Sequence, residues 1–296
     1  MNISSRWANA LTFAILLLVA TATAAGQMPV NDVRTSEHIW LDSDITHQGG
    51  YQWKMKKAGD VADAGEQLSL PDYPTTDWMP AIVPGTVLNS LVYNKMYPEP
   101  YYGINNKIES HLIPDISEIG RDFYTYWFRT EFEVPESFKG KHIWLQLDGI
   151  NYRADVWVNG YLLSSMQGMF LQDYIDVTSF VKIGGNNALA IKVYPVDVPG
   201  STKPKSWGAV GEFHNGGNGN IGWNTTMLMT VGWDFTFMDG IRDRNTGIWK
   251  NISLYATGKL ALRHPFVKSE LRKPGYDQAR ESVSVEVVNP TTGFNP

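Results

Sequence analysis

The feature that most constrains the fold is a series of short segments in which apolar and polar residues alternate. Residues 126–134 read YWFRTEFEV, so that Phe128, Phe132 and Val134 fall on one face and the charged residues on the other. A period of two is typical of a half-buried antiparallel β-strand, because successive side chains of a strand point to opposite faces. Further strands are expected at residues 143–147, 154–158, 174–177, 189–194 and 248–255. Short strands with polar turns and little helix predict an all-β fold, a β-sandwich.

Local turn and capping signals add detail to this sandwich. Asn159-Gly160 between two apolar runs indicates a hairpin with a type I′ turn. Residues 83–93 have the spacing of a helix whose first turn Thr86 can cap, and Pro98 and Pro100 follow it. Two short strands are expected before the helix, at residues 39–41 and 51–53.

The first residues have the pattern of an export signal rather than of a folded element. Residues 1–6 carry a positive charge, residues 8–20 are mostly apolar, and Ala22-Thr23-Ala24 supplies small residues at a signal-peptidase spacing. We therefore expect residues 1–24 to be a signal peptide and the chain to be exported, to the periplasm or outside the cell. The apolar run is shorter than the roughly 18 residues of a membrane-spanning helix, so no membrane partner is expected.

Composition excludes several classes of function. The chain has no cysteine, which rules out disulfides, thiolate catalysis and cysteine-based zinc sites. Its net charge of −5 offers no basic stripe for nucleic acid. The six histidines are scattered without ligand spacing, so no metal or other cofactor is expected, although a calcium ion on the sandwich stays open.

The candidate binding site is the stretch GWDFTFMDGIRDRNTGIW at residues 232–249. It combines aromatic faces, such as Trp233, Phe235 and Trp249, with nearby acids and arginines. Sugars need this mixture, because their C–H faces stack on rings while their hydroxyls bond to charged groups. The alternative is that the aromatic residues belong to the core and the Arg/Asp run is a salt-bridged turn.

Three other features are weaker candidates. The glycine-rich segment 195–232 is longer than a connection needs, which indicates a functional loop. Residues 97–103, YPEPYYG, are expected to form a rigid loop; it could be a surface turn at the sandwich edge, whereas the family resemblance described below implies a place near the sugar-binding side. Asp148 and Asp155 flank one hairpin, and such a carboxylate pair invites an acid/base role as well as an ordinary place in turns and polar faces.

These motifs together resemble one enzyme family. The GWDF and IRDRNTGIW sequences are similar to the end of the N-terminal sugar-binding domain of glycoside hydrolase family 2, nearest its exo-β-glucosaminidase and β-mannosidase-like branch. Five further motifs precede these in the chain and occur in the family's order: VPGTVLNSLV from Val83, YPEPYYGINN from Tyr97, YWFRTEFEVP from Tyr126, LDGINYRADVWVNG from Leu147 and NGGN from Asn215. The resemblance covers about residues 37–258.

The resemblance implies a jelly-roll, galactose-binding-like β-sandwich over residues 25–258. Residues 259–296 then resemble the start of an immunoglobulin-like sandwich, which takes about 100 residues when complete. In the family a retaining mechanism uses two carboxylates about 5 Å apart. Both come from a C-terminal (β/α)8 barrel that this sequence does not contain, and the Asn-Glu signature is absent. No catalytic residue is therefore expected in this chain, which alone should be inactive.

Sugar recognition is the role that the resemblance leaves to this chain. Trp233 and Asp234 match the family's GWDW-type motif, so Trp233 is expected to shape the pocket of the terminal β-linked sugar and Asp234 to accept from a hydroxyl. Phe235 departs from the tryptophan common in relatives, which puts the sugar's identity in doubt. Arg242 and Asp243 are further candidate contacts that also brace the loop.

The expected partners are a carbohydrate and the parent enzyme's own barrel. Two rival interpretations are kept. The chain could be a stand-alone carbohydrate-binding module, or a purely structural sandwich that supports a barrel.

Overall fold

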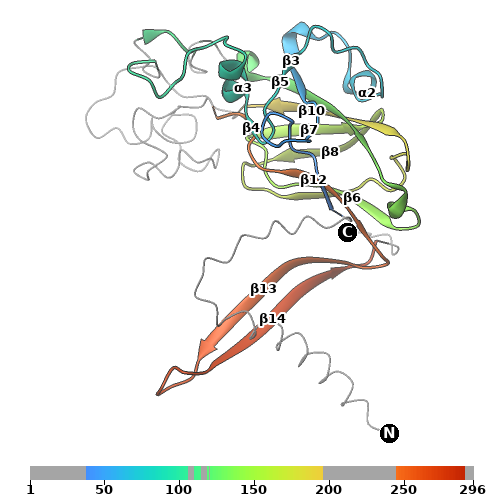
Figure 1. Ribbon diagram of the computed structural model, residues 1–296, viewed down its shortest axis with the longest axis vertical. Coiled ribbons are helices and arrows are strands. Elements are labelled where there is room, and N and C mark those ends of the chain that lie inside the picture. The colour runs from blue at the N-terminus through green and yellow to red at the C-terminus, as the bar shows by residue number, and fades with distance from the viewer. Residues whose placement is uncertain (1–37, 106–109, 115–118, 120, 196–244, 291–296) are drawn as a thin grey trace. The chain divides into compact units, whose positions relative to one another are not determined.

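A computed structural model of the chain describes residues 38–105, 110–114, 119, 121–195 and 245–290 (Figure 1). The expected signal peptide lies outside these residues. None of the helices within the described ranges combines the length and the apolar character that crossing a membrane requires.

Two antiparallel sheets form the body of the fold. The larger has the strand order β3-β2-β5-β10-β7-β8. Its strands, in that order, are Met79–Pro80, Lys54–Lys57, Tyr126–Glu133, Asn186–Tyr194, Arg153–Val158 and Tyr161–Gln167. The smaller has the order β1-β12-β6-β9 and consists of His38–Trp40, Ile252–Thr257, His142–Leu147 and Asp173–Asp176. A separate two-stranded pair joins β4 (Gly85–Thr86) to β11 (Gly247–Ile248).

The main core lies between these two sheets and confirms the predicted β-sandwich. Phe128 and Val156 from the larger sheet and Leu145 from the smaller are fully buried in one hydrophobic cluster. The residues predicted to face inward from their period of two do so on β5, β6 and β7. Apolar burial on this scale is the main driving force for folding of a chain without disulfides.

Strand β5 differs from its expected half-buried state, because its outer face is covered as well. Trp127 packs with Trp157 at a ring-centroid distance of 5.0 Å in a second cluster that also contains Leu68 and Trp78. The cover comes from the connection after β2, which includes the short helices η1 (Ala58–Asp60) and α2 (Gly65–Leu68). An alternating sequence cannot show that a remote segment will cover its polar face.

Local signals located the helix and the hairpin correctly. Helix α3 runs over Val87–Tyr93, and the Thr86 hydroxyl accepts from the Asn89 amide at 2.9 Å as its N-cap. Asn159 and Gly160 have φ of 49° and 92°, as a type I′ turn requires between β7 and β8. Further single-turn helices are η3 (Arg121–Tyr124) and η4 (Glu136–Phe138).

Two strand positions were predicted inexactly. The strand expected at residues 51–53 is found as β2 at Lys54–Lys57, while Tyr51 forms only an isolated bridge with Ser43. The single strand expected at residues 248–255 is divided into β11 and β12. Strand β11 pairs with β4, whereas β12 belongs to the smaller sheet, and residues 249–251 connect the two.

The C-terminal hairpin pairs β13 (Ala261–Leu271) with β14 (Ala279–Val288). These strands are longer than the expected segments 260–267 and 282–288. Most of their side chains are exposed, and large apolar residues such as Phe266 and Val283 are 63% and 69% exposed. At its base the Arg263 guanidinium lies 4.4 Å from the Trp144 ring and 4.5 Å from the Tyr174 ring.

Candidate functional site

The predicted sugar-binding residues belong to the part of the sequence that joins strand β10 to strand β11. Trp233, Asp234, Phe235, Arg242 and Asp243 lie in the segment 196–244, outside the described residues. The structure describes the residues that flank this segment, Tyr194 and Pro195 before it and Asn245 to Gly247 after it, and these flanking residues are what we call its two ends.

The C-terminal end of the segment is held by a compact set of backbone hydrogen bonds. Gly247 and Asn151 exchange two N–H···O bonds, both of 2.8 Å. The buried Asn151 side chain donates through Nδ2 to the carbonyl oxygen of Asn245 at 3.0 Å and to its Oδ1 at 2.9 Å. Strand β11 also pairs with β4, so that Gly247 lies opposite Thr86.

The N-terminal end of the segment is bonded to Tyr152, the residue next to Asn151. The Tyr194 carbonyl, at the end of β10, accepts from the Tyr152 amide at 3.0 Å. The two ends are thus bonded to consecutive residues, Asn151 and Tyr152. The phenol of Tyr194 donates to Asp155 at 2.8 Å, and burial together with this carboxylate raises the pKa of Tyr194 above its usual value.

Trp249 is a packing residue, which agrees with the alternative interpretation for this one aromatic side chain. It forms a small cluster with Tyr152 and Met169, and its Nε1 donates to the Met169 carbonyl at 2.8 Å. The Phe170 ring meets it edge-on at 5.6 Å. Trp249 therefore stabilises the C-terminal end of the candidate sugar-binding stretch by packing.

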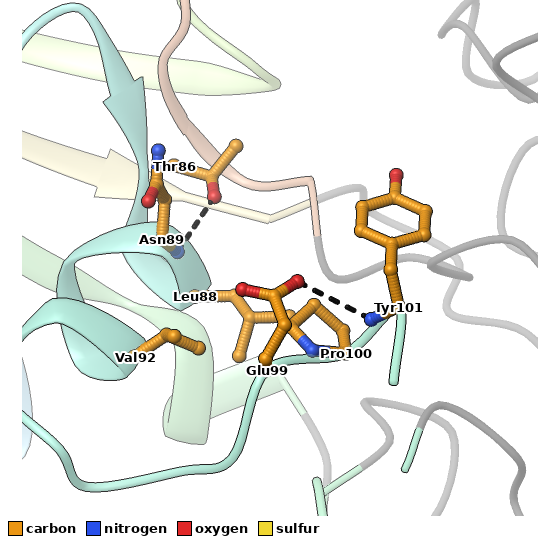
Figure 2. A pocket seen from close by; sticks show the side chains of 7 residues that line it. All are labelled: Thr86, Leu88, Asn89, Val92, Glu99, Pro100 and Tyr101. Atoms are coloured by element: carbon orange, nitrogen blue, oxygen red, sulfur yellow. Dashed lines mark hydrogen bonds between the residues drawn. The ribbon is translucent and has the colours of Figure 1, made fainter. Parts of the chain in front are cut away.

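A cavity of about 240 Å³ lies between α3 and residues 99–101, and we refer to it as the α3 cavity (Figure 2). Its lining consists of Thr86, Leu88, Asn89, Val92, Glu99, Pro100 and Tyr101. In Figure 2 the Glu99 carboxylate lies over Leu88, between the Thr86 and Asn89 side and the Tyr101 side. Residues of the YPEPYYG loop line this cavity together with Thr86 and Asn89, which the sequence did not mark as candidates for binding.

The loop of the α3 cavity is held by its own hydrogen bonds. The Glu99 carbonyl accepts from Asn105 Nδ2 at 2.8 Å and from the Tyr102 amide at 3.3 Å. Glu99 Oε1 accepts from the Tyr101 amide at 3.3 Å. The Tyr101 ring is 77% exposed, so the loop presents an aromatic face to solvent.

The carboxylates considered as an acid/base pair are not brought together. Asp148 follows β6 of the smaller sheet and accepts from Gln146 Nε2 at 2.6 Å and Gln172 Nε2 at 3.1 Å. Asp155 belongs to β7 of the larger sheet and accepts from Ser165 at 2.6 Å and from Tyr194. Asp148 thus bonds to side chains near the end of β6, and Asp155 links β7 to its neighbours β8 and β10, which is the structural role that sequence also allowed.

Within the described ranges, no group of three or more histidine, aspartate or glutamate side chains is placed to hold a metal ion.

Comparison with known proteins identifies the class of fold. A family model described as "Glycosyl hydrolase 2 galactose-binding domain-like" matches residues 53–250. A mannosylglycoprotein endo-β-mannosidase from Lilium longiflorum is 38% identical over 213 residues, which are 71% of this chain and 21% of the relative. An exo-β-D-glucosaminidase from Streptomyces avermitilis is 26% identical over 289 residues, covering 95% of this chain and 27% of the relative.

A solved structure agrees with this assignment. The crystal structure of the exo-chitosanase CsxA from Amycolatopsis orientalis superposes with a TM-score of 0.57 and 25% identity, over 81% of this chain and 24% of that one. The chain therefore spans only about a quarter of the length of the proteins that it matches.

Proposed function

The chain belongs to the galactose-binding-like domain family of glycosyl hydrolase 2, and we propose that it is the non-catalytic N-terminal part of a retaining exo-β-glycosidase. The favoured substrates are glucosaminides or mannosides. The observation that carries this proposal is the family match over residues 53–250, in a chain that covers 21% to 27% of two glycosidases acting on such sugars.

In the proposed enzyme, catalysis and sugar recognition belong to different domains. A retaining glycosidase needs two carboxylates about 5 Å apart, one as acid/base and one as nucleophile. In this proposal both belong to a C-terminal (β/α)8 barrel beyond the present sequence. The sandwich then contributes recognition and is inactive alone.

The segment 196–244 is proposed to complete the sugar pocket. Trp233 and Phe235 would shape it, Asp234 would accept from a sugar hydroxyl, and Arg242 and Asp243 would contact the sugar or brace the segment. Its two ends on Asn151 and Tyr152 support this role, because a binding segment needs a rigid base.

The remaining regions are assigned by the same proposal. Residues 1–24 would direct export, residues 25–258 form the sugar-binding sandwich, and residues 259–296 begin an immunoglobulin-like domain. The exposed apolar side chains of the β13–β14 hairpin support the last assignment, since they require a partner in the complete domain.

The decisive variant is Asp234→Ala in the complete enzyme. We expect kcat/KM on an aryl β-glucosaminide or β-mannoside to fall at least about tenfold, because a charged acceptor of one sugar hydroxyl contributes roughly 1.5–3 kcal/mol. Asp277→Ala, an exposed change in the hairpin turn, is the matched control. Full activity of the Asp234→Ala enzyme would contradict the assigned role.

The mass of the native polypeptide tests the larger claim. A mass several times the 33.2 kDa of this chain agrees with a following barrel. A mass near 33.2 kDa would overturn the glycosidase proposal and leave a carbohydrate-binding module, which calorimetry with chitosan and mannan oligosaccharides would then test.

A further inference from the structure

We propose that the α3 cavity binds one amino-sugar ring, with the Glu99 carboxylate on the sugar's ammonium group and the Tyr101 ring on its apolar face. This inference rests on the proposed function and narrows it, because it selects glucosaminides over mannosides. The size, charge and hydrogen bonding of the cavity support it.

The volume of the cavity suits a single sugar ring. At about 240 Å³ it is smaller than the roughly 300 Å³ at which pockets for drug-sized ligands begin. Its lining combines the apolar residues Leu88, Val92 and Pro100 with residues that carry polar groups. A pyranose has the same two-sided character of C–H faces and equatorial polar groups.

The charge of the cavity favours a cation. Glu99 is the one charged residue among the seven that line it. The Glu99 side chain accepts a single long hydrogen bond, 3.3 Å from the Tyr101 amide, and forms no ion pair with a described residue. Its remaining lone pairs can accept from an ammonium group, which gives a charge-assisted hydrogen bond stronger than one from a neutral hydroxyl.

Neutral polar groups in the cavity are available for hydroxyls. Asn89 is exposed. Its backbone amide donates to the Thr86 hydroxyl, whereas its side-chain amide has no partner among the described residues. An amide can both donate to and accept from a sugar hydroxyl. Tyr101, exposed by 77%, supplies the stacking face that sugars need.

The cavity is rigid and close to the segment proposed to bind sugar. Two hydrogen bonds to the Glu99 carbonyl hold its loop, and Pro98 and Pro100 restrict the backbone on either side of Glu99. Thr86 lines the cavity and also lies opposite Gly247 in the β4–β11 pair. A sugar in the cavity would therefore lie near the root of the segment 196–244.

The test is a ligand titration of the whole chain followed by protein NMR. The probes are methyl β-glucosaminide, at a pH where its amine is protonated, and methyl β-N-acetylglucosaminide, which has the same ring without the charge. We expect the amino sugar to shift amide signals of residues 86–92 and 99–102 with a dissociation constant near millimolar, and the acetylated sugar to bind at least about tenfold more weakly.

Two variants make the result specific. Glu99→Gln keeps the shape and should abolish the preference for the amino sugar, whereas Glu66→Gln, an exposed change on α2, should leave it intact. The inference is overturned if those signals do not respond to the amino sugar, if both sugars bind equally, or if Glu99→Gln retains the preference.

Failure of this inference can be distinguished from failure of the proposed function. If the complete enzyme hydrolyses aryl glycosides but the amino-sugar preference in the cavity is absent, only the inference fails. If the sugar binds in the cavity but the complete protein hydrolyses no glycoside, the proposed function fails and the cavity remains a binding site.

Discussion

Gly247 is the residue on which the close approach of β11 to its neighbours depends. A Cβ at this position would lie 2.5 Å from the Thr86 Cα and 2.6 Å from the Gly85 carbonyl oxygen. Both contacts are with backbone, so neither can be relieved by turning a side chain. The same glycine exchanges two hydrogen bonds with Asn151.

Gly247→Ala should therefore destabilise the sandwich by about 2–3 kcal/mol, since a backbone shift would weaken the β4–β11 pair and the bonds to Asn151. Urea unfolding followed by tryptophan fluorescence measures the change. Gly59→Ala is the control, because a Cβ there has no atom within 4 Å, and its effect should stay within about 0.5 kcal/mol. Equal midpoints for the two variants would contradict the argument.

Glu131 provides a pH-dependent contribution to stability. Burial acts to raise its pKa, but hydrogen bonds from Asn186 and Arg129 and the charge of Arg129 outweigh burial and lower the pKa below 4.5. A lowered folded-state pKa stabilises the fold above the unfolded value of 4.5, and this contribution is lost as the pH falls through the folded value.

We expect the unfolding free energy of the wild type to fall more steeply with decreasing pH below about 4.5 than that of Glu131→Gln, which cannot titrate. Denaturant unfolding at a series of pH values measures this difference. Glu281→Gln, exposed on β14, should keep the wild-type slope. Parallel curves for wild type and Glu131→Gln would show that the folded-state pKa of Glu131 is not lowered.

At the scale of elements, prediction from sequence succeeded where the controlling interactions are local. The Thr86 cap fixes the start of α3, and the Asn159-Gly160 turn fixes the β7–β8 hairpin through neighbours in the chain. The inward faces of β6 and β7 also followed from their period of two.

Prediction failed where a distant segment determines the environment. Arg129 was expected on a polar face, but its Nε donates to the Leu68 carbonyl at 2.9 Å and its Nη2 to the Leu70 carbonyl at 2.8 Å. Those partners are about sixty residues away, and no local pattern reveals them. The α3 cavity has the same origin: the YPEPYYG loop was visible in the sequence, but Asn89 joins it only through tertiary contact.

At the scale of the whole molecule, the β13–β14 hairpin stands out because most of its side chains are exposed. Its contacts with the sandwich include the Arg263 guanidinium on the Trp144 and Tyr174 rings and an edge contact between Tyr174 and His264. Its apolar side chains, Phe266 and Val283 among them, are largely exposed. Such a surface favours self-association.

Truncation after Gly258 should therefore reduce concentration-dependent association while lowering stability by only about 1–2 kcal/mol, the scale of the lost cation–π contacts. Sedimentation velocity and thermal unfolding of the two chains measure both effects. A control with Phe266→Ser and Val283→Ser should reduce association without the loss of stability. A truncated chain that unfolds at room temperature would show instead that the hairpin is part of the sandwich's stability.

Both ends of the segment 196–244 are bonded to Asn151 and Tyr152. This arrangement affects how the sequence of the protein can evolve. The framework bonds that surround the segment are made by residues outside it, so insertions, deletions or exchange of its interior leave those bonds in place. We therefore expect the segment to be exchangeable as a cassette while the residues that flank it keep their bonds. New sugar preferences could then arise by replacing the cassette, without any change in the sandwich that carries it.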